Sequence, residues 1–250
     1  MKITVLGSGT LSPSVRRTAA GILIEHENDL ILLDSGSGIY YKLALAGIDF
    51  HEILYLFYSH YEHPDHINDL PYILFAKKYE SRENKKDIAV TGPRGFISFY
   101  NKIKTLYPVL EELPFKANIT EMHNEKLIYD NFIIESKQMS HGSADANGYR
   151  IESSDKSITY SGDTDYCENI VELANGTDLL ITECSYPDQL KIPNHLSPGI
   201  AGKIASEAGA KKLLLTHFYP QCDEYDILKQ AEMNFSGEII LAEDMMQIEI

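Results

Sequence analysis

Residues 58–68, which read YSHYEHPDHIN, contain three of the nine histidines and an aspartate. They follow directly on an apolar run that predicts a buried strand over 53–59. Imidazole and carboxylate are the groups that hold Zn²⁺ and similar divalent ions, and a strand end can fix ligands only a few residues apart. A solvated histidine-rich loop is the ordinary alternative, but such loops seldom follow a buried strand without an intervening polar run. The spacing therefore predicts a metal site that includes His60, His63, Asp65 and His66.

Three more candidate ligands lie in the second half of the chain. His141 precedes a Gly-Ser-Ala-Asp stretch, Asp163 follows a glycine in YSGDT, and His217 ends the apolar run LLLTH. Taken alone, they have ordinary explanations as a surface-loop histidine, a turn aspartate and a hydrogen-bonded core histidine. A strand end that faces a cleft also presents ligands, so the position of His217 fits a site as well as a core.

Turn residues and hydrophobic periodicity divide the chain into two similar halves, each with strands followed by helices. This order fits an α/β sandwich of two sheets with helices outside, and one domain over 1–250. The first three strands are expected to form a small antiparallel sheet, and Ser197 and Pro198 to begin a helix. Strands are expected over 3–7, 20–26, 30–36, 53–59, 88–92, 127–136, 147–163, 178–183, 213–220, 238–244 and 247–250, helices over 38–46, 70–80, 95–107, 197–210 and 223–235, and a solvated loop over 81–87.

Nearly the whole chain resembles the metallo-β-lactamase superfamily. Residues 60–66 are similar to its His-x-His-x-Asp-His signature, and GSGTLSPS, LLDSGSG, TGPRGF, YSGDT and LTHFYP occur around them in family order. GSGT, GPRG, GDT and the HLSP at 195–198 are most similar to the ribonuclease Z and phosphodiesterase branch. The resemblance implies a four-layer αββα sandwich, with two β-sheets flanked by helices, and a metal-dependent hydrolase.

The resemblance also implies two divalent ions, with Zn²⁺ expected first and Mn²⁺ or Fe²⁺ as alternatives. One ion would be held by His60, His63 and His141. The other would be held by Asp65, His66 and His217. Asp163 would bridge the two ions, and a metal-bound hydroxide would attack the substrate.

Further residues would support this chemistry. Asp65 would double as a proton acceptor and His195 would donate a proton to the leaving group, although local capping of a turn is the ordinary role of such a histidine. Asp34 and Glu183 would contact ligands from behind. The loop Gly7, Ser8, Gly9 and Thr10 could line the cleft or touch a phosphate, or could simply be a tight turn.

One departure from the family pattern is an additional residue between the first two histidines, which reads His60-Tyr61-Glu62-His63. A β-bulge at the strand end would swing Tyr61 outward and leave His60 as the ligand. Tyr61 could instead bind as a phenolate, or the site could lack both ligands, in which case one ion would be weakly held or absent.

Composition limits the substrate and the compartment. A formal net charge of −15 opposes extended nucleic acid as a partner, although two divalent ions would attract a small anionic or nucleotide substrate. Three irregularly spaced cysteines, with no signal-like start and no long apolar run, predict a cytoplasmic protein that does not enter membranes. A homodimer is expected on frequency alone.

The expected reaction is therefore hydrolysis of a small phosphodiester or an RNA end. tRNA processing is less expected, because no Gly/Pro-rich basic insertion lies between TGPRGF and His141. Two alternatives stay open. One is a lactone, thioester or amide hydrolase on the same ions, and the other is a metal-binding member without turnover.

Overall fold

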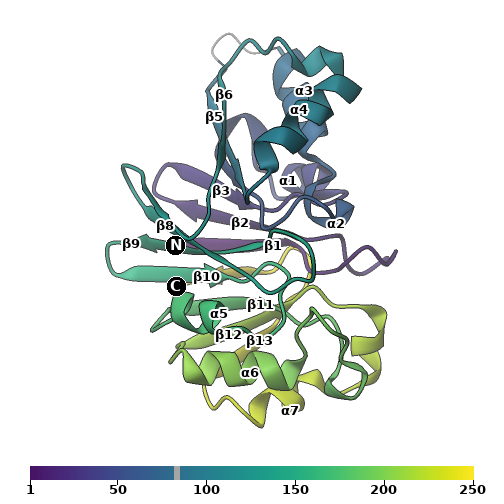
Figure 1. Cartoon of the computed structure of the whole chain (residues 1–250), viewed down its shortest axis with the longest axis vertical. Helices are drawn as coiled ribbons and strands as arrows, with labels where there is room; N and C mark the ends of the chain where they lie inside the picture. Colours follow the sequence, from purple (N-terminus) through teal and green to yellow (C-terminus); the bar gives the residue numbers. More distant parts are fainter. Residues whose placement is uncertain (82–84) are drawn as a thin grey trace.

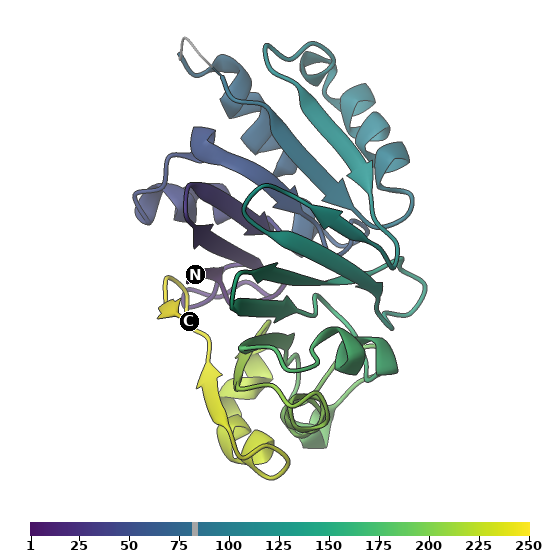
Figure 2. The ribbon, with the colours of Figure 1, turned by 90° about the vertical axis from the view of Figure 1, so that its left-hand side faces the viewer.

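The computed structural model describes residues 1–81 and 85–250. Within these residues, two mixed sheets of seven strands each pack face to face, and helices cover the outer face of each sheet (Figure 1). Figure 2 shows the same layers from the side, with the two ends of the chain next to each other. The four-layer αββα sandwich is confirmed. Residues 82–84 of the expected loop 81–87 lie outside the described residues.

The first sheet has the strand order β14-β1-β2-β3-β4-β5-β6. Its strands are β1 (Lys2–Gly7), β2 (Gly21–His26), β3 (Asp29–Leu33), β4 (Ile53–Phe57), β5 (Ile88–Gly92), β6 (Ala117–Glu121) and β14 (Gln247–Glu249). Pairing is antiparallel from β14 to β3 and parallel from β3 to β6. Its helices are α1 (Ile39–Leu45), α2 (Pro64–Ile67), α3 (Leu70–Tyr79) and α4 (Phe96–Leu106), with short 3₁₀ turns η1 (Phe50–Glu52) and η2 (Pro108–Leu110).

The second sheet has the order β13-β12-β11-β10-β9-β8-β7. Its strands are β7 (Lys126–Ile128), β8 (Ile133–Gln138), β9 (Asn147–Ser153), β10 (Lys156–Tyr160), β11 (Leu179–Glu183), β12 (Lys212–Thr216) and β13 (Glu238–Leu241). Pairing is antiparallel from β7 to β10 and parallel from β10 to β13. Its helices are α5 (Glu168–Leu173), α6 (Pro198–Glu207) and α7 (Ile227–Glu232), with 3₁₀ turns η3 (Asp188–Leu190) and η4 (Pro220–Glu224).

Side chains that alternate along the strands of the first sheet contribute to two hydrophobic cores, one on each face of the sheet. In β2, Ile22 and Ile24 face the core between the sheets, whereas Leu23 faces the core under the helices. Successive side chains of a strand point to opposite faces, so an uninterrupted apolar run is what a sheet covered on both sides requires. This explains why the apolar runs of β2, β3 and β4 carry no polar alternation.

Several expected elements are corrected in detail. The small antiparallel sheet is one part of a seven-stranded mixed sheet, and the runs 127–136 and 147–163 are the hairpins β7–β8 and β9–β10. The helix expected over 223–235 is the shorter α7, because the Asp226 side chain caps it by accepting the Lys229 amide. Ser197 is the N-cap residue of α6, but its side chain makes no capping hydrogen bond.

The carboxyl ends of strands in both sheets meet at one edge of the sandwich. The segments that follow β3, β4, β8, β10 and β12 carry Asp34, the cluster 60–66, His141, Asp163 and His217, in that order. Ligand sites of α/β sheets form at such edges, so the fold brings the candidate residues together. Across the described residues, none of the helices has the length and apolar character needed to cross a bilayer.

Candidate metal centre

The candidate ligands form two adjoining groups, although they are up to 157 positions apart in sequence (His60 to His217). The three-histidine group comprises His60, His63 and His141, and Asp163 completes it. The Asp65 group comprises Asp65, His66 and His217. Within each group, potential ligand atoms all lie within 4.8 Å of one another. The structure thus brings together all seven residues that the sequence indicated.

Ring nitrogens converge inside each group. His60 Nε2 lies 3.0 Å from His63 Nδ1, and His141 Nε2 lies 3.2 Å from the same His63 atom. In the Asp65 group, His217 Nε2 is 3.2 Å from His66 Nε2 and 3.6 Å from Asp65 Oδ2. Such clusters of imidazole and carboxylate atoms suit a first-row divalent ion.

The outer nitrogens of these rings face hydrogen-bond acceptors, and this fixes which ring nitrogen carries a lone pair. His66 Nδ1 donates to Asp34 at 2.8 Å, and His141 Nδ1 donates to the Asn194 carbonyl at 3.0 Å. The Ser59 hydroxyl gives its proton to Asp34, so it accepts from His60 Nδ1 at 3.1 Å. Because the outer nitrogens hold the protons, the inward Nε2 atoms present lone pairs, as metal ligands must.

Asp163 supplies a second sign that the centre is built for cations. Its Oδ1 is buried and has no hydrogen-bond partner among the described residues. Burial alone would raise the pKa of this carboxyl, but the surrounding imidazoles of His217, His66 and His60 hold it well below its usual range. A buried, ionised oxygen without a donor is costly unless a cation binds it. The residues present therefore fit a pair of divalent ions.

Asp34 supports the Asp65 group through its hydrogen bond with His66. It is fully buried and accepts hydrogen bonds from the Ser59 amide (2.7 Å), the Ser59 hydroxyl (2.7 Å) and Tyr160 (2.8 Å), in addition to His66. Tyr160 belongs to the second sheet, so Asp34 ties the two sheets together beside the ligands. Asp34 thereby orients a candidate ligand, as expected for it.

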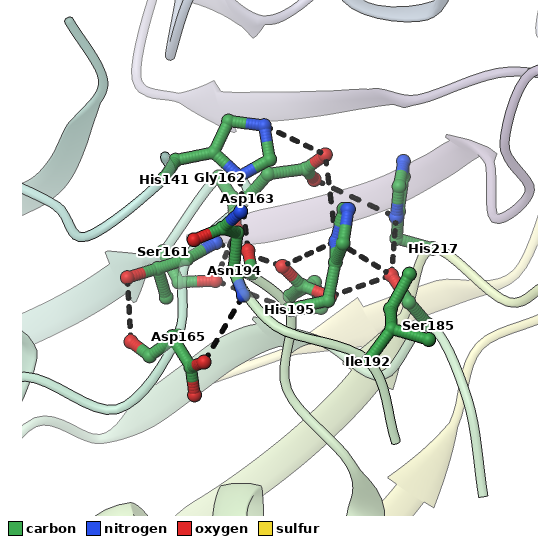
Figure 3. A network of polar contacts seen from close by, with 12 residues as sticks. His141, Ser161, Gly162, Asp163, Asp165, Ser185, Ile192, Asn194, His195 and His217 are labelled. Atoms are coloured by element: carbon green, nitrogen blue, oxygen red, sulfur yellow. Dashed lines mark hydrogen bonds and ion pairs between the residues drawn. The ribbon is translucent and has the colours of Figure 1, made fainter. Parts of the chain in front are cut away.

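Glu183 has a partly different role from the expected one. Its Oε1 accepts from His195 Nδ1 at 3.0 Å, so its direct partner is not one of the seven candidate ligands. Its Oε2 accepts the Ser185 hydroxyl at 2.6 Å, and Ser185 in turn accepts from His217 Nδ1 at 3.1 Å. Glu183 thus reaches His217 through Ser185. Figure 3 shows Asp163 between His141 and His217, with His195 alongside.

His195 lies at the centre rather than at a distant turn. Its ring is stacked on that of His217 with 6.2 Å between centroids, and it meets His141 edge to face at 5.1 Å. Burial lowers the pKa of His195, but the hydrogen bond and charge of Glu183 outweigh it and raise the pKa to about 9. Because Nδ1 is engaged by Glu183, Nε2 is the nitrogen left to meet a substrate.

Asp34 and His217, which directly follow strands β3 and β12, adopt left-handed backbone conformations. Asp34 and His217 have φ of 57° and 58°, which non-glycine residues seldom adopt. Gly162, directly before Asp163, has φ of 57°, and a Cβ there would lie 2.4 Å from the Ser59 Cβ. The glycine of the GDT sequence is therefore required both by its conformation and by close packing against the loop that carries His60.

The additional residue near His60 is accommodated in a loop, so the expected β-bulge is wrong. Strand β4 ends at Phe57, and residues 58–63 form bends that need not keep a ladder register. The Tyr61 hydroxyl donates to the Arg94 carbonyl at 3.2 Å, and its ring stacks on Phe99 with 4.9 Å between centroids. Tyr61 therefore points away from the centre, whereas His60 lies in the three-histidine group.

This placement predicts opposite results for two neighbouring substitutions. Tyr61→Phe should leave metal content unchanged, because only a hydrogen bond to a carbonyl outside the centre is lost. His60→Ala should remove a ring nitrogen from the three-histidine group and lower the content to about one ion per chain. Elemental analysis of both purified variants tests this. Loss of metal in Tyr61→Phe would instead favour the phenolate.

In the loop Gly7–Thr10, for which lining the cleft and forming a tight turn were both open, most contacts are internal to the fold. Ser8 is fully buried, and its amide and hydroxyl both donate to Asp244 at 2.9 Å. A Cβ on Gly7 would lie 1.9 Å from the Ala19 carbonyl oxygen, so the glycine allows two backbones to approach closely. Of Gly7, Ser8, Gly9 and Thr10, only Thr10 lines a cavity of about 400 Å³ that also reaches Asp65.

Several residues that position the candidate ligands carry little signal in the sequence. Ser59, Ser185 and Asn194 fix ring tautomers, and Tyr160 supports Asp34 from the opposite sheet. Ser59, Ser185 and Asn194 are each close to a residue that was singled out, and that was the only signal. Tyr160 is the first residue of the quoted YSGDT, but nothing in that sequence indicated that its hydroxyl reaches Asp34.

Comparison with known proteins places this centre in a family. Residues 30–218 match the family model described as "Beta-lactamase superfamily domain". The chain belongs to the metallo-β-lactamase superfamily. Its sandwich and its clustered histidines and aspartates are thus those of a superfamily member, and its relatives named as hydrolases place it among the metallo-hydrolases.

Among superfamily members, "Probable metallo-hydrolase YhfI" of Bacillus subtilis is 30% identical over 250 residues, which cover 97% of each chain. The crystal structure of YhfI matches with a TM-score of 0.86 at 26% identity, over 100% of this chain and 99% of that one. The short form of human tRNase Z has the same fold, with a TM-score of 0.82 at 24% identity over 100% and 99% of the two chains.

Ribonuclease Z of Thermobifida fusca is 26% identical over 301 aligned positions, covering 100% of this chain and 94% of the relative. This chain supplies only 250 residues, so about 50 of those positions have no counterpart here. The alignment with YhfI, by contrast, has 250 positions. In length, this superfamily member is therefore closer to YhfI than to the ribonuclease.

Proposed function

We propose that this protein hydrolyses a small phosphodiester at a centre of two divalent ions. The observation that carries the proposal is the convergence of seven ligand-type side chains, among them Asp163, whose buried Oδ1 accepts no hydrogen bond from the described residues. His60, His63 and His141 would hold one ion and Asp65, His66 and His217 the other, and Asp163, which lies beside both groups, would supply negative charge to both. Ligands come from both halves of the chain, which supports a single domain over 1–250.

The ions, when bound, supply an activated water and stabilise the negative charge that develops on the scissile group. The chain's own residues then handle protons. Burial raises the pKa of Asp65, but a hydrogen bond from His217 and the charge of His66 outweigh it and lower the pKa to about 2. Asp65 is therefore ionised at neutral pH and can accept a proton from the attacking water.

His195 acts as the proton donor to the leaving group. Glu183 accepts from its Nδ1, so Nε2–H of the protonated ring is available to the leaving oxygen. The cationic form is present below the pKa and lost above it. Bound cations lower the pKa of a neighbouring imidazolium, so in the loaded enzyme the midpoint should lie below about 9.

This role predicts an alkaline fall in activity. kcat should decline as the pH rises through the pKa of His195, because the donor is then neutral. His195→Gln should reduce kcat by about 10²- to 10⁴-fold and remove that alkaline limb, while metal content stays the same. A pH profile of kcat for both proteins tests this. An unchanged limb in the variant would assign the limb to another group.

Two observations favour a small phosphodiester over an RNA. The net charge of −15 opposes the many phosphate contacts that an extended nucleic acid requires. The chain also lacks about 50 positions that the ribonuclease Z relative has. A cyclic nucleotide or short oligonucleotide end needs only the cationic centre and the adjoining cavity of about 400 Å³.

The test is a substrate panel on the Zn²⁺- or Mn²⁺-loaded protein. We expect turnover of cyclic nucleotides and dinucleotides, much slower cleavage of a precursor tRNA, and no turnover of lactones or thioesters. Asp163→Asn is the inactive control. Preferred hydrolysis of a lactone would contradict the substrate class, and fewer than one bound ion with no turnover on any substrate would contradict the enzyme itself.

A further inference from the structure

Asp165 lies two residues beyond Asp163 and joins three segments around the three-histidine group. Its Oδ2 accepts from the Asn194 amide at 3.0 Å and from Lys191 Nζ at 2.9 Å, and its Oδ1 accepts from the Tyr166 amide at 2.8 Å. Its own amide donates to the Ser140 carbonyl at 2.7 Å, directly before His141. The carboxylate therefore fastens the segment 191–195 to the segment that carries Asp163, and the backbone amide of the same residue joins that segment to the one that carries His141 (Figure 3).

The fastened segment holds the partner of His141. The Asn194 carbonyl accepts from His141 Nδ1 at 3.0 Å, which leaves Nε2 as the inward lone pair. Asn194 adopts a left-handed backbone with φ of 70°, a conformation that needs support from its surroundings. The bond from the Asn194 amide to Asp165 supplies that support, and the carbonyl of the same residue meets the histidine.

We propose that Asp165 is a positioning residue for the ion held by the three-histidine group, acting through Asn194 on His141. The inference rests on the proposed function, since it presumes that His141 is a ligand. Without the carboxylate, the Asn194 carbonyl is free to move, and His141 can adopt the tautomer with its proton on Nε2. Partners of this kind typically contribute 10- to 100-fold to metal affinity.

If Asp165 only stabilised the fold, its loss would leave metal affinity unchanged. The chain offers a matched control for this alternative, Asp178. Asp178, at the amino end of β11, accepts from the Ser157 amide at 2.8 Å and from Lys211 Nζ at 2.7 Å. Like Asp165, it accepts from a backbone amide of another segment and from a lysine. It lies at the opposite end of β11 from Glu183, so its loss should affect folding stability alone.

The experiment is a Zn²⁺ titration of the full chain against a competing chromophoric chelator, with thermal unfolding of the metal-free proteins alongside. In Asp165→Ala, we expect one of the two binding steps to weaken by about 10-fold or more, and the other to remain. Asp165→Asn keeps an oxygen acceptor for the Asn194 amide, so it should retain most of the lost affinity. Asp178→Ala should lower Tm but leave both binding steps unchanged.

Each other outcome overturns the inference. Unchanged Zn²⁺ binding in Asp165→Ala, or an equal loss in Asp178→Ala, would show that Asp165 serves stability alone. If Asp165→Ala fails to fold, full loss of the same binding step in a folded Asp165→Asn would overturn the claim that the oxygen acceptor is what matters. A wild-type chain that binds no Zn²⁺ would overturn the proposed function as well, so the two failures are distinguishable.

Discussion

Asp163→Asn is expected to reduce kcat/KM on any phosphodiester substrate by on the order of 10³-fold or more, a loss at least as large as that of a single oxyanion-hole donor. The substitution keeps the shape of the side chain and removes its charge. The wild-type carboxylate is buried between the two groups of ligands, with Oδ1 lying 3.3 Å from His66 Nε2 and 3.5 Å from His217 Nδ1. A neutral amide cannot balance two divalent ions at this position.

Thermal unfolding gives a second measurement that does not depend on finding the substrate. Ions that bind only the folded state stabilise it, by about 4 kcal/mol at 1,000 times the dissociation constant. A chelator should therefore lower the Tm of the wild-type protein and have little effect on Asp163→Asn. Equal chelator sensitivity in both proteins would show that Asp163 does not bind the ions.

Asp34→Asn is expected to inactivate the protein by changing the tautomer of His66. Asp34 Oδ1 accepts the Ser59 amide, so the amide oxygen of the substituted side chain would take that place and its NH₂ would replace Oδ2. The NH₂ group donates, so His66 Nδ1 would have to accept and its proton would move to Nε2. Nε2–H cannot bind a cation. The expected result is loss of the ion of the Asp65 group, and a fall in kcat of about 10⁴-fold, the cost when a triad carboxylate is replaced by an amide.

Metal content and circular dichroism distinguish a changed His66 tautomer from a general loss of folded structure. Asp34→Asn should keep its secondary structure by circular dichroism, because the Ser59 or the Tyr160 hydroxyl can turn to accept the one NH₂ hydrogen that His66 does not take. Asp178→Asn, which changes a carboxylate far from the ligands in the same way, should retain both ions. Retention of two ions and full activity in Asp34→Asn would contradict the role assigned to Asp34.

Most of the candidate centre could be predicted because its residues carry a local signal. The density of histidines over 58–68 and the sequences YSGDT and LTHFYP each stand out within a few positions, and the resemblance linked them. The sandwich was also predictable, because apolar runs and turn residues mark most strands. Boundaries were less certain where a turn is short, as in the hairpins β7–β8 and β9–β10.

The choice between His60 and Tyr61 was open in the sequence because both residue types can bind metals and the spacing fits neither perfectly. The tertiary structure favours His60 through contacts distant in sequence, since the Tyr61 ring packs on Phe99 of α4 and His60 lies among the other candidate ligands. The direct partner of Glu183 was undecidable for the same reason. Whether it meets His195 or His217 depends on how the segment 184–197 folds back over the strand ends.

The sequence alone indicated which side chains could bind cations and at which strand ends they lie, because ligand chemistry belongs to residue type and strand periodicity is local. Only the tertiary structure decided how each ring is protonated and held, through Asp34, Ser59, Ser185 and Asn194. Hydrogen bonds of this kind join groups from different strands and both sheets. Their geometry exists only after the two sheets have packed, so no spacing along the chain could reveal it.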